Sequence, residues 1–144
     1  MYLLDTNVIS ELRKAGDGRA DAHVLAWLRS VDAAELYISA ITAMELELGI
    51  LLVERRDKPQ GRHLRTWLEH RVLTEFADRT LPVDKAVALR CARLHVPNPR
   101  PERDAYLAAT ALVHGMTMVT RNVADFEATG VALLDPWNPR APGS

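Results

Sequence analysis

Four carboxylates are placed so that each follows a predicted strand or lies near the start of a predicted helix. They are Asp5, Glu45, Asp104 and Asp125. Carboxylates that gather without a basic partner repel one another, and proteins accept such a cluster mainly where a divalent cation neutralises it. A site of oxygen ligands suits Mg²⁺ or Mn²⁺ rather than Zn²⁺, and such ions activate water and hold a scissile phosphate. The pattern therefore indicates metal-dependent hydrolysis of a phosphodiester.

The first of these acids, Asp5, comes directly after a short apolar run. Residues 1–4 predict a buried strand, and a helix is expected from Thr6 onward because apolar side chains recur there at helical spacing. A carboxylate at this junction lies at the carboxyl edge of a sheet, where open α/β sheets bind ligands. Taken alone, Asp5 is either a helix cap or the first residue of a site.

Glu45 lies near the start of a long predicted helix over residues 39–56, which Ser39 or Thr42 would cap. At about 100° per residue, Glu45 lies at the edge of the expected buried stripe and Glu47 turns toward solvent. Glu45 could bond back to the helix start in a capping box, or share a cation with Asp5. The stripe is expected to consist of Ile41, Met44, Leu48, Leu51 and Leu52.

Asp104 and Asp125 occupy the corresponding places later in the chain. Asp104 opens a helix over residues 102–114, whose several alanines would let it lie close against the sheet, and the helix dipole favours its ionised form. Asp125 lies in a polar loop after a strand at 117–120. As alternatives, Asp104 is a cap and Asp125 pairs with Arg121.

The elements that must position these acids alternate between strands and helices, which indicates an α/β fold. We predict one domain over residues 1–136, with a mostly parallel central sheet of four to five strands flanked by helices on both faces, and a Pro-rich tail over 137–144. The expected strands are 1–4, 36–39, 80–83, 117–120 and 131–134. After the helix from Thr6, the expected helices are 20–31, 39–56, 60–76, 85–95 and 102–114.

Composition restricts the class of protein. A chain of 144 residues with 48% hydrophobic and 26% charged residues is typical of a single globular domain. No apolar run approaches the roughly 20 residues of a membrane span, no secretion signal is recognisable, and a lone Cys91 excludes an intrachain disulfide. We therefore expect a cytoplasmic protein. With a net charge of −1, any attraction for nucleic acid must come from local patches or bound metal ions.

Other enzyme classes lack their motifs. An aspartate-dependent phosphatase needs a second aspartate two residues after the nucleophile, where this chain has Asn7. No Gly-x-Gly-x-x-Gly follows the first strand, no histidines are paired at i and i+4 for a metal, and no Gly-x-Ser-x-Gly elbow is present. Cys91 has apolar neighbours in a predicted helix, which favours a core position.

Four motifs in order resemble those of PIN-domain proteins, in particular the VapC and FitB toxins of bacterial toxin–antitoxin pairs. They are LeuLeuAspThrAsnValIleSer at 3–10, SerAlaIleThrAlaMetGluLeuGluLeuGly at 39–49, ArgAspAlaTyrLeuAlaAlaThrAla at 103–111 and ValThrArgAsnValAlaAspPhe at 119–126. The resemblance covers nearly the whole chain. It implies a ribonuclease that depends on Mg²⁺ or Mn²⁺ and is held inactive by a cognate antitoxin of the VapB or FitA type.

By the same resemblance, the catalytic and metal-binding acids are Asp5, Glu45, Asp104 and Asp125, and the supporting polar residues are Thr6, Asn7, Thr120 and Asn122. Some family members carry Asp at the position of Asn122, so either Asn122 or Asp125 would complete the site. The family also implies a homodimer, with exposed apolar residues on the early helices as candidates for its interface. The rival hypothesis is a PIN-like protein that binds RNA or an antitoxin without cutting. The sequence identifies no substrate-binding residues.

Overall fold

The computed structural model describes residues 1–138 and contains a sheet of five short strands, all parallel. Their order across the sheet is β3-β2-β1-β4-β5, so the first strand lies at the centre. The strands are β1 (Tyr2–Leu4), β2 (Leu36–Ser39), β3 (Thr80–Leu81), β4 (Thr117–Val119) and β5 (Leu133–Leu134). The predicted parallel α/β sheet is confirmed, but the edge strands β3 and β5 have two residues each where four were expected.

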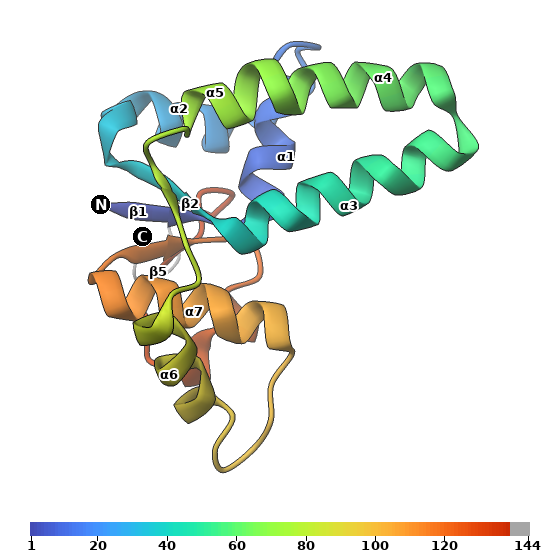
Figure 1. Cartoon of the computed structure of the whole chain (residues 1–144). Helices are drawn as coiled ribbons and strands as arrows, with labels where there is room; N and C mark the ends of the chain where they lie inside the picture. The colour runs from blue at the N-terminus through green and yellow to red at the C-terminus, as the bar shows by residue number, and fades with distance from the viewer. Residues whose placement is uncertain (139–144) are drawn as a thin grey trace.

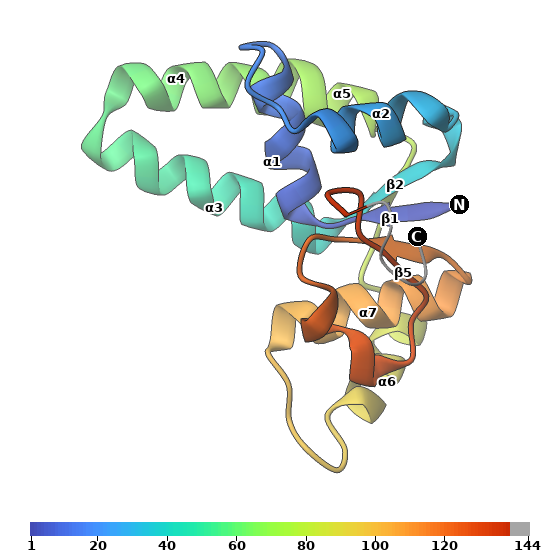
Figure 2. The ribbon, with the colours of Figure 1, turned by 180° about the vertical axis from the view of Figure 1, so that it is seen from behind.

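Helices cover both faces of the sheet, as Figures 1 and 2 show from opposite sides. The α-helices are α1 (Thr6–Ala15), α2 (Ala22–Ser30), α3 (Ala40–Arg56), α4 (Lys58–Trp67), α5 (Leu73–Glu75), α6 (Lys85–Leu94) and α7 (Glu102–His114). The helix predicted over 60–76 is interrupted by a π-helical turn, η2 (Leu68–Val72), between α4 and α5. Three 3₁₀ turns complete the described part: η1 (Ala33–Glu35), η3 (Val123–Asp125) and η4 (Glu127–Thr129).

Alternation along β1 divides the core between the two faces. Leu4 packs with Val8 and Ile9 of α1 and with residues of α3 and the α4–α5 segment, whereas the adjacent Leu3 packs with Leu107 and Ala108 of α7. Successive side chains of a strand point to opposite faces of the sheet. Because helices cover both faces, both leucines are fully buried. The alanines of α7 lie at its buried face and allow the helix to approach the sheet closely, as predicted.

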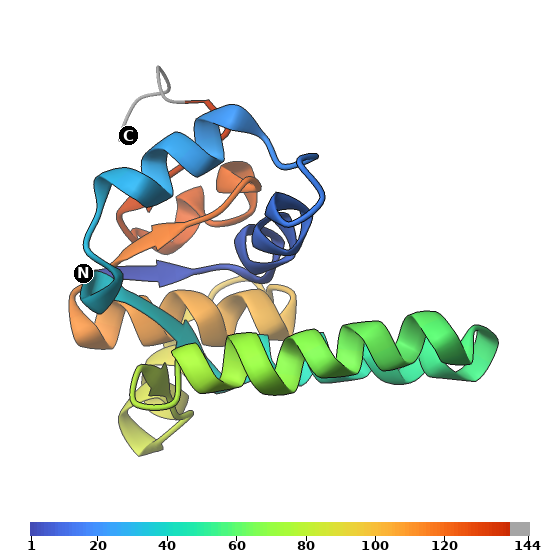
Figure 3. The same ribbon diagram turned by 90° about the horizontal axis from the view of Figure 1, so that it is seen from above.

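The buried face of α3 differs from the predicted stripe. Its buried residues are Thr42, Leu46 and Ile50, which recur every four residues, while Met44, Leu51 and Leu52 are exposed. The reason is that α3 runs outward with α4 as a hairpin beyond the sheet, which is clear from above in Figure 3. Only the row of α3 that meets α4 and α1 is covered, so an apolar pattern alone did not reveal which side is buried.

Two features hold α3 and α4 together as a hairpin: a close contact at Gly61 and two ion pairs made by Arg65. At Gly61, an added Cβ would lie 2.5 Å from Cγ and 2.9 Å from Cα of Glu54, so the two helices meet where only glycine fits. Four residues on, Arg65 donates to Glu47 and, at 2.9 Å, to Glu54. The hydrogen bond from Arg65 lowers the pKa of Glu47. Glu47 is thereby engaged with α4 and turned away from the sheet.

The C-terminal end of the described chain returns to the core. Trp137 packs against the cluster around Leu4, so packing extends one residue beyond the predicted boundary at 136. Residues 139–144 of the predicted tail lie outside the described residues. Among residues 1–138, no helix combines the length and the apolar character required to cross a bilayer.

Candidate active site

Three neighbouring parallel strands end at the same edge of the sheet and place polar side chains there. Asp5 follows β1 at the centre, Thr120 follows β4 on one side, and β2 on the other side leads into α3 and Glu45. This edge is where open parallel sheets bind ligands, because the strand-to-helix connections leave a crevice. The topology therefore brings together residues that are more than a hundred positions apart.

Asp5 lies at the centre of this edge and is nearly inaccessible, with 8% of its surface exposed. Its Oδ1 accepts a hydrogen bond from the backbone N–H of Thr6 at 2.7 Å, and its Oδ2 accepts from the Thr120 hydroxyl at 2.7 Å. Asp5 thus caps α1 and at the same time joins β1 to the residue after β4. The two alternatives that the sequence left open for Asp5 are compatible.

Glu45 turns toward the same edge. Its Oε1 accepts a hydrogen bond from the Thr6 hydroxyl at 2.7 Å, and its Oε2 lies 3.7 Å from a guanidinium nitrogen of Arg103. Ser39 provides the cap of α3, since its hydroxyl accepts from the N–H of Ile41. Glu45 is therefore bound to α1 and α7 through side chains, and the capping-box alternative is wrong.

Asp104 lies on the first turn of α7 and completes a set of mutually repelling acids. Burial raises the pKa of Asp104, and the charges of Asp5, Asp125 and Glu45 raise it further. Burial also raises the pKa of Asp5, against the hydrogen bonds from Thr120 and Thr6, with smaller contributions from Glu45 and Asp125. The charges of Glu45 and Asp125 therefore act on both Asp5 and Asp104, and the charge of Asp5 acts on Asp104.

Asp125 and Asn122 lie in the loop after β4, and both side chains are exposed. Arg121 does not pair with Asp125 in the structure: its guanidinium lies over the ring of Trp137, 5.3 Å from the ring centroid. The backbone N–H of Asn122 donates to the Thr120 hydroxyl at 3.0 Å. Asp125 contributes negative charge to the site, while Asn122 contributes a backbone contact to Thr120.

Two residues at the site were not among the predicted ones. Thr42 is fully buried one turn before Glu45, with its hydroxyl 3.5 Å from the Thr6 hydroxyl. Arg103 pairs with Glu45. Among residues 1–138, no other Lys or Arg forms an ion pair with one of the four acids. The spacing of Thr42 and Glu45 on one helix face is a signal that the sequence held. The pairing of Arg103 depends on how α3 and α7 meet.

The donor set suits a hydrated magnesium-type ion. All candidate ligands are oxygens, and the buried Oδ1 of Asn7 has no hydrogen-bond partner in the described part of the chain, although its amide nitrogen lies 3.5 Å from the Thr120 hydroxyl. Within residues 1–138, no three Asp, Glu, His or Cys side chains are grouped tightly enough to enclose a metal ion. Mg²⁺ commonly keeps several waters and binds through one or two carboxylates, so an open arrangement of this kind fits it.

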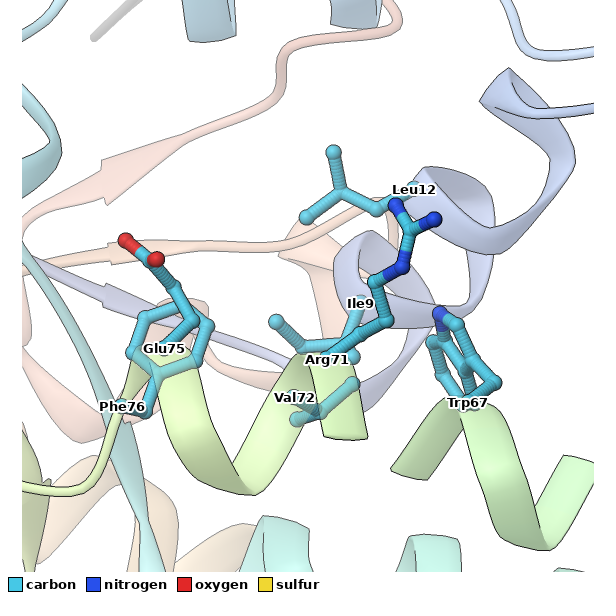
Figure 4. Close-up of a pocket in the computed structure, with 7 residues that line it drawn as sticks. All are labelled: Ile9, Leu12, Trp67, Arg71, Val72, Glu75 and Phe76. Carbon is cyan, nitrogen blue, oxygen red and sulfur yellow. The ribbon is translucent and has the colours of Figure 1, made fainter. Parts of the chain in front are cut away.

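An apolar pocket lies elsewhere, between α1 and the α4–α5 segment (Figure 4). Its walls include Ile9, Trp67 and Phe76, with Arg71 and Glu75 at its margin. None of the four acids lines this pocket. Its lining offers no cluster of oxygen ligands, so the sheet edge is the better candidate for chemistry.

Comparison with known proteins identifies the same stretch of chain. The PIN domain family matches residues 2–131. VapC ribonuclease Y4jK of Sinorhizobium fredii is 40% identical over 147 residues, covering 96% of this chain and 99% of that protein. Toxin FitB of Neisseria gonorrhoeae is 41% identical over 144 residues, covering 96% and 99%.

Solved structures agree with this. A chain in the crystal structure of FitAcB from Neisseria gonorrhoeae has a TM-score of 0.85 and 38% identity, covering 95% of this chain and 99% of that one. A chain in a toxin–antitoxin complex from Klebsiella pneumoniae has a TM-score of 0.64 and 25% identity, covering 94% and 98%. Both similarities extend over nearly the whole chain.

Proposed function

Since the chain belongs to the PIN-domain family and is related to VapC and FitB toxins, we propose that it is a metal-dependent endoribonuclease and the toxin of a toxin–antitoxin pair. The observation that carries the proposal is the meeting of Asp5, Glu45, Asp104 and Asp125 at one sheet edge, where the pKa values of Asp5 and Asp104 are raised. A protein tolerates such repulsion where a cation relieves it. Relatives named ribonucleases make RNA the substrate that we propose.

Asp5, Glu45 and Asp104 would hold Mg²⁺ or Mn²⁺, with Asp125 as a further ligand, direct or through water. When bound, the ion supplies an activated water and stabilises negative charge on the phosphate. The protein's own part is to orient the carboxylates: the Thr6 N–H and Thr120 hydroxyl fix Asp5. The Thr6 hydroxyl likewise fixes Glu45. The buried Oδ1 of Asn7 has no hydrogen-bond partner in the described part of the chain and can accept a hydrogen bond from a water at the site.

The direct test is cleavage of a labelled single-stranded RNA while Mg²⁺ or Mn²⁺ is titrated. We expect cleavage by the wild type to require the metal, and Asp104→Asn to abolish it while the circular dichroism spectrum stays that of a folded protein. Glu69→Gln is the control, because Glu69 is an exposed acid of η2 whose charge does not act on Asp5 or Asp104. Undiminished cleavage by Asp104→Asn at saturating metal would overturn the assignment.

The rival hypothesis, a protein that binds RNA or an antitoxin without cutting, makes the opposite prediction for growth arrest. A binder should arrest growth without regard to metal and should keep this effect in Asp5→Asn. An enzyme should lose the effect, because that substitution removes a ligand from the centre of the site. Expression of the two forms in the same cells distinguishes the hypotheses.

The relationship to toxins of toxin–antitoxin complexes supports a small cognate antitoxin as partner. We propose that this antitoxin inserts a segment beside the four acids at the sheet edge, and that the pair acts in the cytoplasm. We expect the antitoxin gene to lie beside this one, and co-purification from the native operon should yield a stable complex that does not cleave RNA. A toxin that purifies alone and is harmless to cells would count against this. A homodimer is part of the same proposal, and Leu51 and Leu52 on α3 are the exposed apolar residues that we propose for its interface.

A further inference from the structure

A pocket adjoins the acidic edge on the side where the first turns of α3 and α7 meet. Two of its walls are the proposed metal ligands Glu45 and Asp104. The remaining wall combines apolar side chains, Ile41 and Met44 of α3 and Pro101 and Tyr106 at the start of α7, with one further carboxylate, Glu102. At about 500 Å³, the pocket is large enough for a small planar ligand. It is continuous with the site already described.

Arg103 stands at the junction between this pocket and the acids. Its side chain is 50% exposed, and its contact with Glu45 is long for an ion pair, at 3.7 Å. A guanidinium has five N–H donors, and one distant carboxylate leaves most of them open to another partner. A metal ion bound to Glu45 would partly neutralise the negative charge of that carboxylate, and Glu45 would then attract Arg103 less strongly. Arg103 is therefore placed to pair with an anion that enters beside the acids.

We propose that Arg103 and the apolar wall form the subsite for the nucleotide next to the scissile phosphate. Arg103 binds a phosphate of the RNA backbone, and Met44, Ile41 and Tyr106 pack against the attached base. This inference rests on the proposed ribonuclease function and adds to it the position of a substrate group and a residue that binds it.

Charge favours a nucleotide over an apolar peptide as occupant. The acids repel phosphate, and the whole chain carries a net charge of −1, so an approaching RNA gains from each cation near the site. Arg103 provides that charge where the pocket meets the acids, and guanidinium groups match phosphate geometry well. An apolar and aromatic wall beside a phosphate contact is also the usual setting for an unpaired base.

The test uses the full chain with a labelled single-stranded RNA in Mg²⁺. Arg103→Gln should raise KM by about tenfold or more, the typical loss for one charged hydrogen bond. The slope of log(kcat/KM) against log salt concentration should become shallower by about 0.7, the value for one phosphate contact on a single strand. In the absence of RNA, calorimetric titration should show that Arg103→Gln binds Mn²⁺ at least as tightly as the wild type, because Glu45 loses a competing cation.

Met44→Gln tests the apolar wall at a position that is 41% exposed and hence safe for folding. It should raise KM and alter the preferred base at the cleavage position, while Mn²⁺ affinity stays unchanged. The matched controls are Arg93→Gln and Leu89→Gln, which alter an exposed arginine and an exposed leucine of a pocket between α6 and α7 that is lined by none of the four acids. Both controls should behave as the wild type.

The subsite is refuted if Arg103→Gln leaves KM and the salt slope unchanged, or if Arg93→Gln changes them equally. A change of oligomeric state or loss of antitoxin binding, with KM unaltered, would show that a second copy or the antitoxin covers this pocket instead. Absence of metal-dependent cleavage by the wild type would refute the proposed function, and the subsite with it. If the wild type cleaves RNA with metal and the Arg103→Gln variant has the same KM as the wild type, the subsite is refuted while the proposed function stands.

Discussion

The substitution Asp104→Asn should make the metal-free protein more stable at neutral pH, although it removes a proposed ligand. Asp104 is partly buried on the first turn of α7, and burial together with Asp5, Asp125 and Glu45 raises its pKa. A raised pKa means that the folded state disfavours the ionised carboxyl. Asparagine has nearly the same shape without the charge, so the repulsion disappears.

The expected gain is about 1 kcal/mol, the usual size of the stability change from a single substitution. Each unit by which a pKa is raised costs the ionised form about 1.4 kcal/mol in the folded state, and partial exposure of Asp104 reduces the effect through solvent screening. Against this, the variant loses the favourable interaction of a negative charge with the N-terminus of α7. For a domain of this size, a gain of about 1 kcal/mol corresponds to about 3 °C in Tm.

The sign of the pH dependence follows from the direction of the pKa shift. Below the ordinary pKa of about 4, Asp104 is protonated in both the folded and the unfolded state, so wild type and variant should differ little. As the pH rises through the raised folded pKa, the wild type loses stability relative to Asp104→Asn. The difference should be complete at neutral pH. Calorimetry with EDTA at several pH values measures it.

Two comparisons decide whether the reasoning holds. Glu102→Gln removes a charge from the same turn of α7 without affecting the acidic set, so it should lack the stabilisation and isolates the contribution of the helix dipole. Saturating Mg²⁺ should raise the Tm of the wild type and not that of Asp104→Asn, since only the wild type keeps the full site. A variant less stable than the wild type at pH 7.5 in EDTA, or an equal difference at pH 4, would refute the electrostatic account.

Two further predictions concern the framework of the site. Gly61→Ala should destabilise the fold by about 1–3 kcal/mol in urea denaturation, because the added Cβ would meet Glu54. Gly49→Ala, on the open side of α3, should stabilise the fold by about 0.5–1 kcal/mol. Equal effects of the two substitutions would contradict the close contact between α3 and α4. Thr120→Val should cost about 1–3 kcal/mol and raise the pKa of Asp5 further in an NMR titration, because the buried carboxylate loses the hydroxyl at 2.7 Å; an unaltered pKa would show that Thr120 does not stabilise the ionised form.

Local chemistry made the junctions of this chain predictable. Asp5 directly after an apolar run, Ser39 before a long helix and Asp84 before another all cap helices in the structure as their residue types suggest. The alternation of these elements fixed the parallel α/β fold, because parallel strands need crossover connections. The four candidate acids could be named for the same reason, since each lies at such a junction or near one.

The buried side of α3 could not be found in this way. Apolar residues occupy more than one side of this helix, and only the tertiary contacts with α4 and α1 select Leu46 and Ile50 over Met44 and Leu51. The choice of Glu45 had rested partly on the wrong stripe. In the structure, what separates the two glutamates is their partners: Thr6 holds Glu45, and Arg65 holds Glu47.

By itself, then, the sequence determined which residues end strands and begin helices, because capping and hydrophobic periodicity act over a few neighbouring positions. The tertiary structure decided which of these ends lie side by side. The pairing of Arg103 with Glu45, the hydrogen bond from Thr120 to Asp5, and the raised pKa of Asp104 all arise between segments distant in the chain. Such interactions depend on distance in space, which only the packing of helices on the sheet establishes.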